Sequence, residues 1–158
     1  MATTTEESNE LRSPFYIHDQ YVKDLTFENP NFLMKYSQEP SQPQVTVNVE
    51  ASVASLDNGN YEVTLDIAVK STVEDTQLFV LELKYAGLIA VAPEIQQDIL
   101  ETVLLVHCPF LMFPYAREIV SSVTSSGGYP PLMIEPIDFA SLYISKKQQG
   151  EKQVNAAG

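Results

Sequence analysis

The chain has 158 residues, of which 44% are hydrophobic and 19% charged, and its formal net charge is −12. This length suits one domain with a sizeable core, and the composition is that of a globular protein. The acidic balance argues against nucleic acid and anionic lipid as partners, because phosphates are bound by Lys and Arg, and it favours a basic partner.

The cysteine and histidine content excludes two further classes of site. Cys108 is the single cysteine, so an internal disulfide is excluded. With only His18 and His107 as histidines, a zinc site has little support. We therefore expect no metal and no cofactor.

The two ends of the chain are polar. Residues 1–14 are acidic and lack the basic and apolar regions of a signal peptide, which predicts a flexible arm on a cytoplasmic protein. Residues 147–158 predict a flexible tail. No apolar run approaches the roughly 20 residues that span a bilayer, so we expect no membrane insertion. The domain is expected over residues 15–146.

The first predicted strand covers residues 15–27. Its alternation is interrupted at Asp19 and Lys23, which is typical of a bent strand or an edge strand. Five apolar residues share odd numbering and are expected to face the core: Phe15, Ile17, Tyr21, Leu25 and Phe27. Asn29-Pro30-Asn31 ends the strand and begins a long connection.

Three more strands are predicted by alternation. Residues 45–53 and 61–69 each alternate five apolar positions with polar ones, and Asp57-Asn58-Gly59 between them predicts a hairpin turn. Residues 77–90 form the next run, with these apolar residues on one face: Phe79, Leu81, Leu83 and Tyr85. The four runs predict an antiparallel sheet with one face buried.

Helices follow the strands. Pro93-Glu94 predicts the start of a long helix that Pro109 and Pro114 kink or break, and that ends at Gly127-Gly128. A short last helix is predicted from Asp138, which would cap it. The class is α+β: a four-stranded antiparallel sheet with helices packed on one face, a long proline-interrupted helix and a short C-terminal helix.

The strand parity predicts an acidic face on the sheet. Lys70 and Lys84 are the nearby positive charges that partly balance the acids on that face. The acids expected to project opposite the core are Asp24, Glu28, Glu50, Glu62, Asp66 and Glu82. On charge alone, a solvated face that keeps the protein soluble is the better interpretation, and docking of a basic partner is the alternative.

No pattern for catalysis is present in the sequence. His107 and Cys108 are adjacent, and neighbouring helical residues point in different directions, so they do not form a nucleophile–base pair. There is neither a phosphate loop nor a dinucleotide fingerprint. We expect no enzyme, although a binder of small ligands or an enzyme with a pocket between helix and sheet remains an alternative.

Three proline-containing motifs occur in order: Cys108-Pro109, Phe113-Pro114-Tyr115-Ala116-Arg117-Glu118 and Pro136-Ile137-Asp138-Phe139. They resemble the signature of the SecB family, and the resemblance extends over about residues 15–143. It implies an ATP-independent cytosolic chaperone that binds unfolded precursor proteins and delivers them to the ATPase SecA. A SecB-like chaperone that controls a toxin–antitoxin system is the alternative.

The resemblance also implies two binding surfaces. The acidic face would dock SecA through Asp24, Glu28, Val80 and Glu82. The groove for unfolded preproteins would lie between the first connection, the last helix and the sheet. Its candidate residues are Phe32, Leu33, Met34, Tyr36, Phe79, Tyr85, Leu142, Tyr143 and Ile144.

Assembly is the last expectation. Apolar residues fall on several sides of the 95–123 helix, which predicts burial between subunits. The resemblance implies a homotetramer, a dimer of dimers, with the first strand pairing across the dimer and covering an edge. The candidate interface residues are Tyr21, Leu104, Phe110, Phe113, Tyr115 and Val120.

Overall fold

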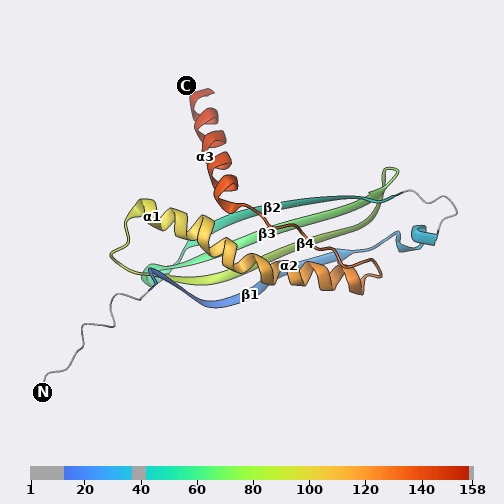
Figure 1. The fold of residues 1–158 in the computed structure, drawn as a ribbon, viewed down its shortest axis with the longest axis horizontal. Helices are drawn as coiled ribbons and strands as arrows, with labels where there is room; N and C mark the ends of the chain where they lie inside the picture. The colour runs from blue at the N-terminus through green and yellow to red at the C-terminus, as the bar shows by residue number, and fades with distance from the viewer. Residues whose placement is uncertain (1–12, 37–41, 157–158) are drawn as a thin grey trace, which may run out of the picture.

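The computed structural model describes residues 13–36 and 42–156. A sheet of four strands forms one layer, and α1 and α2 cross one of its faces, while α3 leads away from the sheet beside β2 (Figure 1). The predicted α+β class, with helices on one face of an antiparallel sheet, is confirmed. Residues 1–12 of the predicted arm lie outside the described residues.

The strands are β1 (Phe15–Glu28), β2 (Gln44–Ser55), β3 (Asn60–Val73) and β4 (Thr76–Val91). They lie in the order β1-β4-β3-β2, with every neighbouring pair antiparallel. The predicted hairpin turn between β2 and β3 is present, with φ of 63° at Asn58 and 73° at Gly59. The edges of the sheet are therefore β1 and β2, and the predicted edge position of β1 is confirmed.

Two bulges in β1 change which side chains face the core. The pairing with β4 shifts between Ile17 and Asp19 and again between Val22 and Asp24. Between these bulges the parity is inverted, because each extra residue moves the following side chains to the other face. Tyr21 therefore lies opposite Ala86 on the outer, helix-free face of the sheet. The prediction that Tyr21 faces the core is wrong for this reason.

The long helix is continuous where the sequence predicted a kink or break. It consists of α1 (Gln97–Thr102), a π turn η3 (Val103–His107) and α2 (Cys108–Ser126). The Cys108 N–H donates to the Val103 carbonyl, and this wider turn accommodates Pro109 without ending the helix. The helix starts later than predicted, at Gln97.

The stretch Gln97–Ser126 is long and apolar enough, by length and composition alone, to cross a membrane. The expectation that no segment reaches that length is therefore wrong for the helix as a whole. Core helices of soluble proteins meet the same criterion, and this helix packs along the sheet.

The core lies between α2 and the inner faces of β3 and β4. Gly87 lets the helix approach closely, since a Cβ there would be 3.0 Å from the Met112 Sδ. Three candidate interface residues belong to this core instead of a free surface, because they are buried within one subunit: Leu104, Phe113 and Val120. The core side chains with almost no exposure include Leu65, Ile67, Leu81, Leu83 and Met112.

Helix α3 (Phe139–Ala156) is capped as predicted. The Asp138 carboxylate accepts the Ser141 N–H at 3.1 Å and the Ser141 hydroxyl at 2.8 Å. Phe139 anchors the helix, packing edge-to-face on Phe113 with 5.8 Å between ring centroids. The helix continues past the predicted domain end at residue 146.

Candidate functional site

The inner face of β2 is open to solvent. Val45, Val47 and Val53 point to the side of the sheet that carries the helices, yet they are 46%, 37% and 36% exposed. Helix α2 packs on β1, β3 and β4, while the long helix reaches β2 mainly at η3, so much of this edge stays uncovered. An exposed row of β-branched residues beside a free strand edge is unusual, because natural sheets normally cover such edges.

Three hollows share β2 as their floor. The first, of about 540 Å³, lies between Val45, Val47 and Val49 and the segment 132–137, here called the strap. The second, of about 230 Å³, includes Ala51, and the third, of about 200 Å³, includes Val53. We call this continuous series the β2 groove. Four two-residue steps along a strand span about 27 Å, which matches an extended segment of roughly eight residues.

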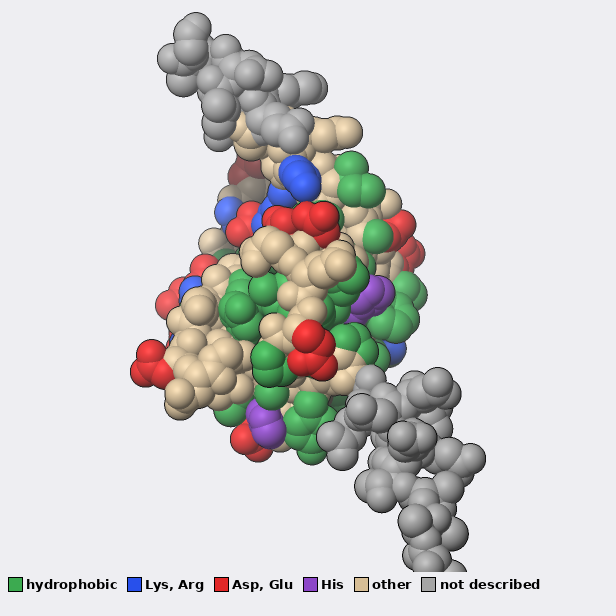
Figure 2. Space-filling model, turned by 90° about the vertical axis from the view of Figure 1, so that its left-hand side faces the viewer, with side chains coloured by type: hydrophobic (Ala, Val, Ile, Leu, Met, Phe, Trp, Pro, Cys, Tyr) green, Lys and Arg blue, Asp and Glu red, His purple; other side chains and the backbone are tan. Residues whose placement is uncertain are grey.

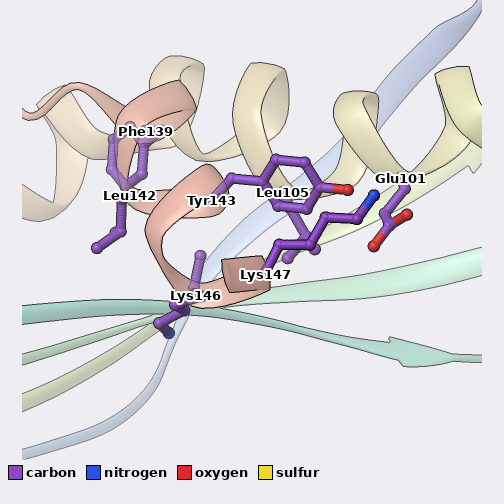
Figure 3. A pocket seen from close by; sticks show the side chains of 8 residues that line it. Glu101, Leu105, Phe139, Leu142, Tyr143, Lys146 and Lys147 are labelled. Carbon is purple, nitrogen blue, oxygen red and sulfur yellow. The ribbon is translucent and has the colours of Figure 1, made fainter. Parts of the chain in front are cut away.

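The middle hollow combines an apolar interior with a charged rim (Figure 3). Leu105 comes from η3, and Leu142 and Tyr143 come from α3. At the rim the Lys147 ammonium lies 5.8 Å from the centroid of the Tyr143 ring. Within the described ranges, no group of three His, Cys, Asp or Glu side chains could hold a metal ion. This hollow is shaped to take apolar side chains.

The structure separates the predicted preprotein-binding residues into two sets. Leu142 and Tyr143 line the β2 groove, and Ile144 is exposed beside it. The short helix η1 (Phe32–Tyr36), which carries Phe32, Leu33, Met34 and Tyr36, lies instead against β4 and the turn after α2. The two sets do not face each other within one subunit.

Phe79 and Tyr85, the predicted floor of the groove, are buried in the core. The Phe79 ring lies 4.8 Å from that of Tyr129. The Tyr85 hydroxyl donates to Gln20 Oε1 at 3.1 Å, and burial raises the pKa of Tyr85. Neither side chain offers much surface to a ligand. The sequence predicted that the β2 valines face the core, and it did not single out the strap for binding; together they line the β2 groove.

The four residues predicted for docking of a basic partner do lie together. In the register of β1 and β4, Asp24 faces Lys84, Thr26 faces Glu82 and Glu28 faces Val80, all on the outer face. We call Asp24, Glu28, Val80 and Glu82 the acidic patch. Its carboxylates are exposed to solvent.

Two other acids of the outer face are held in ion pairs. Elsewhere on the outer face, Glu62 pairs with Lys23 at 2.5 Å and accepts the Tyr21 hydroxyl, and Asp66 pairs with Lys84 at 3.1 Å. The hydrogen bonds from Lys23 and Tyr21 lower the pKa of Glu62, while the bond to Glu62 raises that of Tyr21 to about 12.

Within the described part of the chain, no ion pair involves Asp24, Glu28 or Glu82. Their negative charge is available to a cationic partner.

A second exposed apolar surface lies on the helix layer. Phe110 and Tyr115, both predicted for an interface, are 65% and 58% exposed on α2, and Ile99 and Leu111 extend this surface. Figure 2 views the end of the molecule where α1 lies, and hydrophobic side chains there stand open to solvent between acidic ones. We call these four residues the helix-layer patch.

Comparison with known proteins identifies the family. Residues 8–150 match the family model described as preprotein translocase subunit SecB. This chain belongs to the SecB family. It is 43% identical to the protein-export protein SecB of Afipia carboxidovorans, over 97% of this chain and 96% of the relative. The SecB of Parvibaculum lavamentivorans is 45% identical, over 87% and 82% of the two chains.

A solved structure supports the fold. The SecB-like chaperone of Mycobacterium tuberculosis, in complex with a ChAD peptide from the HigA1 antitoxin, superposes with a TM-score of 0.65. The likeness covers 78% of this chain and 91% of that one at 15% identity, and therefore concerns the fold alone. SecB proteins are chaperones of protein export, which agrees with the expectation that this chain is not an enzyme.

Proposed function

We propose that this chain is an ATP-independent cytosolic chaperone that binds unfolded precursor proteins in the β2 groove and delivers them to SecA. The open inner face of β2 is the observation that supports it most. An extended client can place every second side chain into a hollow, while its backbone pairs with the free edge of β2. A folded protein presents neither an extended backbone free to pair with β2 nor apolar side chains free to enter the hollows.

The size of the groove fits a weak but general interaction. Burying one client side chain contributes about 1.5–3 kcal/mol before the cost of ordering the client. One groove of roughly eight residues therefore holds a client only moderately well. Tight binding requires a client that crosses several grooves in one assembly, since linked sites bind far more tightly than separate ones.

The proposed assembly is a homotetramer, a dimer of dimers, with the helix layers enclosed between two sheets. The helix-layer patch supports this arrangement, because Phe110 and Tyr115 are large apolar side chains that a subunit interface would cover. The outer faces and the β2 grooves would remain accessible. Mass measurement by light scattering tests the assembly, and Phe110→Ser should shift it towards smaller species.

Delivery is proposed to use the acidic patch. Its carboxylates have no ion pair within the described residues, so they attract a basic segment of SecA at a rate that depends on salt. Val80 adds an apolar contact beside Glu28. Client and SecA would then occupy opposite faces of the sheet, and both can be bound at once.

The chaperone activity is tested with one precursor protein in two states. The purified chain should bind the urea-denatured precursor after dilution and should ignore the native precursor, as measured by light scattering. It should also keep the diluted precursor from aggregating without added ATP. A chain that fails to bind denatured precursor at low salt contradicts the proposal.

The SecA surface is tested with two matched substitutions on the same face. Glu82→Gln removes a charge that has no ion pair among the described residues, whereas Glu62→Gln removes one already paired with Lys23. Glu82→Gln should weaken SecA binding several-fold at low salt and reduce its salt dependence, and Glu62→Gln should change it less. Equal effects of the two variants contradict the assignment.

A role in a toxin–antitoxin system is the second candidate. The solved SecB-like chaperone bound to an antitoxin peptide is the observation that favours it. The identity of 43% to an export SecB weighs more heavily than 15% to that chaperone. A toxin–antitoxin operon beside the gene would favour the second candidate.

A further inference from the structure

The helix η1 places an aromatic ring directly on a glycine. A Cβ at Gly128 would lie 2.5 Å from Phe32 Cε2, so no side chain other than hydrogen fits beneath the ring. Gly128 also has φ of +93°, which L side chains rarely adopt. The turn after α2 therefore provides a flat platform that the Phe32 ring covers.

The platform continues into a row of rings. The centroid of Tyr129 lies 5.6 Å from that of Phe32 and 4.8 Å from that of Phe79, and Phe27 lies 5.6 Å beyond Phe79. Tyr129 is fixed by its own hydroxyl, which donates to Asn29 Oδ1 at 2.6 Å. Gly128 and Tyr129 thus form a preformed aromatic site, defined here as the Gly128 site, that does not depend on Phe32.

The occupant is held far more loosely than the site. None of the five residues of η1 is buried, and Leu33 and Tyr36 are 77% and 72% exposed. Beyond the Phe32 ring, the Lys35 ammonium donates to the Gly128 carbonyl at 3.0 Å in an exposed bond. On its other side, η1 contacts β4, and Asn31 just before it donates to the Gln77 carbonyl at 2.7 Å, which fixes the point from which η1 would open. A five-residue helix with so little burial opens at small cost in free energy.

We propose that Phe32 is an internal ligand of the Gly128 site, and that an aromatic side chain of a client binds there by displacing it. This inference rests on the proposed function. One aromatic ring replaces another on the same platform, so the exchange needs no new cavity. Because the closed state competes with the client, the apparent affinity is reduced by the fraction of chains in which the site is open.

The displacement gives the chaperone a preference within its clients. A segment without aromatic residues uses the β2 groove alone and leaves η1 closed. A segment with an aromatic residue gains the binding free energy of the Gly128 site as well, reduced by the free energy needed to open η1. Phe32 lowers this gain, so only a segment whose aromatic side chain binds the Gly128 site more strongly than the cost of opening profits from it.

Two dye-labelled peptides test the proposal on the full-length chain. Each has 20 residues, mainly Gly and Ser, with either three Phe or three Leu at the same positions. Phe32→Ala should bind the Phe peptide about 3–10-fold more tightly than the parent chain, because the competitor is gone. Affinity for the Leu peptide should stay within about twofold. Leu56→Ala, which removes an exposed apolar side chain at the β2–β3 hairpin, is the control and should change neither affinity.

A charge-matched pair provides a milder perturbation. Lys35→Ala removes the bond to Gly128 and should tighten binding of the Phe peptide, by less than Phe32→Ala does. Lys70→Ala changes the net charge equally on the outer face of the sheet and should have no effect. This pair keeps the test decisive if Phe32→Ala fails to fold.

Displacement can also be seen directly. With 4-fluorophenylalanine at position 32, the ¹⁹F resonance should move towards its solvent-exposed value when the Phe peptide is added, and not with the Leu peptide. Weaker binding of the Phe peptide by Phe32→Ala would mean that Phe32 is itself a client contact and would overturn the proposal. Unchanged binding, or an immobile ¹⁹F resonance, overturns it as well.

The same experiments separate this inference from the proposed function. If the parent chain binds denatured precursor while the Phe32 and Lys35 variants behave like it, only the displacement is wrong. If the parent chain binds no denatured precursor, the chaperone function itself fails.

Discussion

Strands β2 and β3 lie side by side with the same apolar alternation, and they end in opposite environments. Val47 of β2 pairs directly with Val69 of β3, and both point to the side of the sheet that carries the helices. Val69 is 1% exposed and Val47 is 37% exposed. The difference is coverage, since α2 packs on β3 and β4 whereas β2 faces the strap, the base of α3 and the π turn η3, with hollows between them.

This contrast shows that alternation in a sequence specifies the direction of a side chain and not its burial. An α-helix is about 10–12 Å across, whereas the outer strands of a four-stranded sheet lie about 14 Å apart. One long helix cannot cover all four strands. The uncovered strand is the one that can bind a client, and the covered one supplies stability.

The largest expected effect is on the free energy of unfolding. Val69→Ala should lower it by about 2–3 kcal/mol, because methyl groups are lost from a closed core, whereas Val47→Ala should lower it by less than about 1 kcal/mol. Urea unfolding of both variants at one protein concentration measures the difference, since assembly contributes to apparent stability. Equal losses would show that β2 is covered in the assembled protein.

Binding of denatured precursor should depend more on the β2 valines than on Val69 of β3. The double substitution Val45→Ser and Val47→Ser removes apolar floor from the β2 groove and should weaken binding of denatured precursor about tenfold or more. The assembly mass should remain that of the parent chain. Precursor binding is measured by fluorescence anisotropy, with Val69→Ala as the control. A larger loss of binding in Val69→Ala than in the double variant would reverse our assignment of the two strands.

The reactivity of Cys108 tests whether the core between α2 and the sheet stays closed. Cys108 is buried on α2, and burial raises its pKa to about 12. Burial favours the neutral thiol in the folded state. The folded state tolerates the buried thiol without penalty below the ordinary pKa of 9.0, and the free energy of unfolding falls as pH rises from there towards 12. Ellman's reagent at pH 8 should label the native chain only at the rate of unfolding. Rapid labelling would indicate that the core opens.

The smallest expected effect concerns the helix that borders the open side. The Ser141 backbone N–H lowers the pKa of Asp138, so the cap of α3 is intact above the ordinary value of 3.8 and is lost as pH falls below it. The hydrogen-exchange protection factors of the first turn of α3 should fall at low pH and in Asp138→Ala at neutral pH. Asp138→Asn should keep the protection, since Asn caps helices nearly as well.

Several features of this protein were determined by the sequence alone. The alternation from Val45 onward located β2 and β3, Asn58-Gly59 located their hairpin, and Asp138 located the start of α3. The even-numbered acids of β1 and β4 were correctly placed on the outer face, because side-chain direction follows from a period of two. The proline motifs identified the family.

Tertiary structure decided the rest. The bulges that turn Tyr21 outward, the continuous helix through Pro109 and Pro114, and the separation of η1 from α3 depend on contacts between distant segments. The open floor of β2 and the burial of Phe113 and Val120 depend on where a single helix lies across the sheet. Local sequence fixes the direction of each side chain, and only packing in three dimensions fixes what covers it.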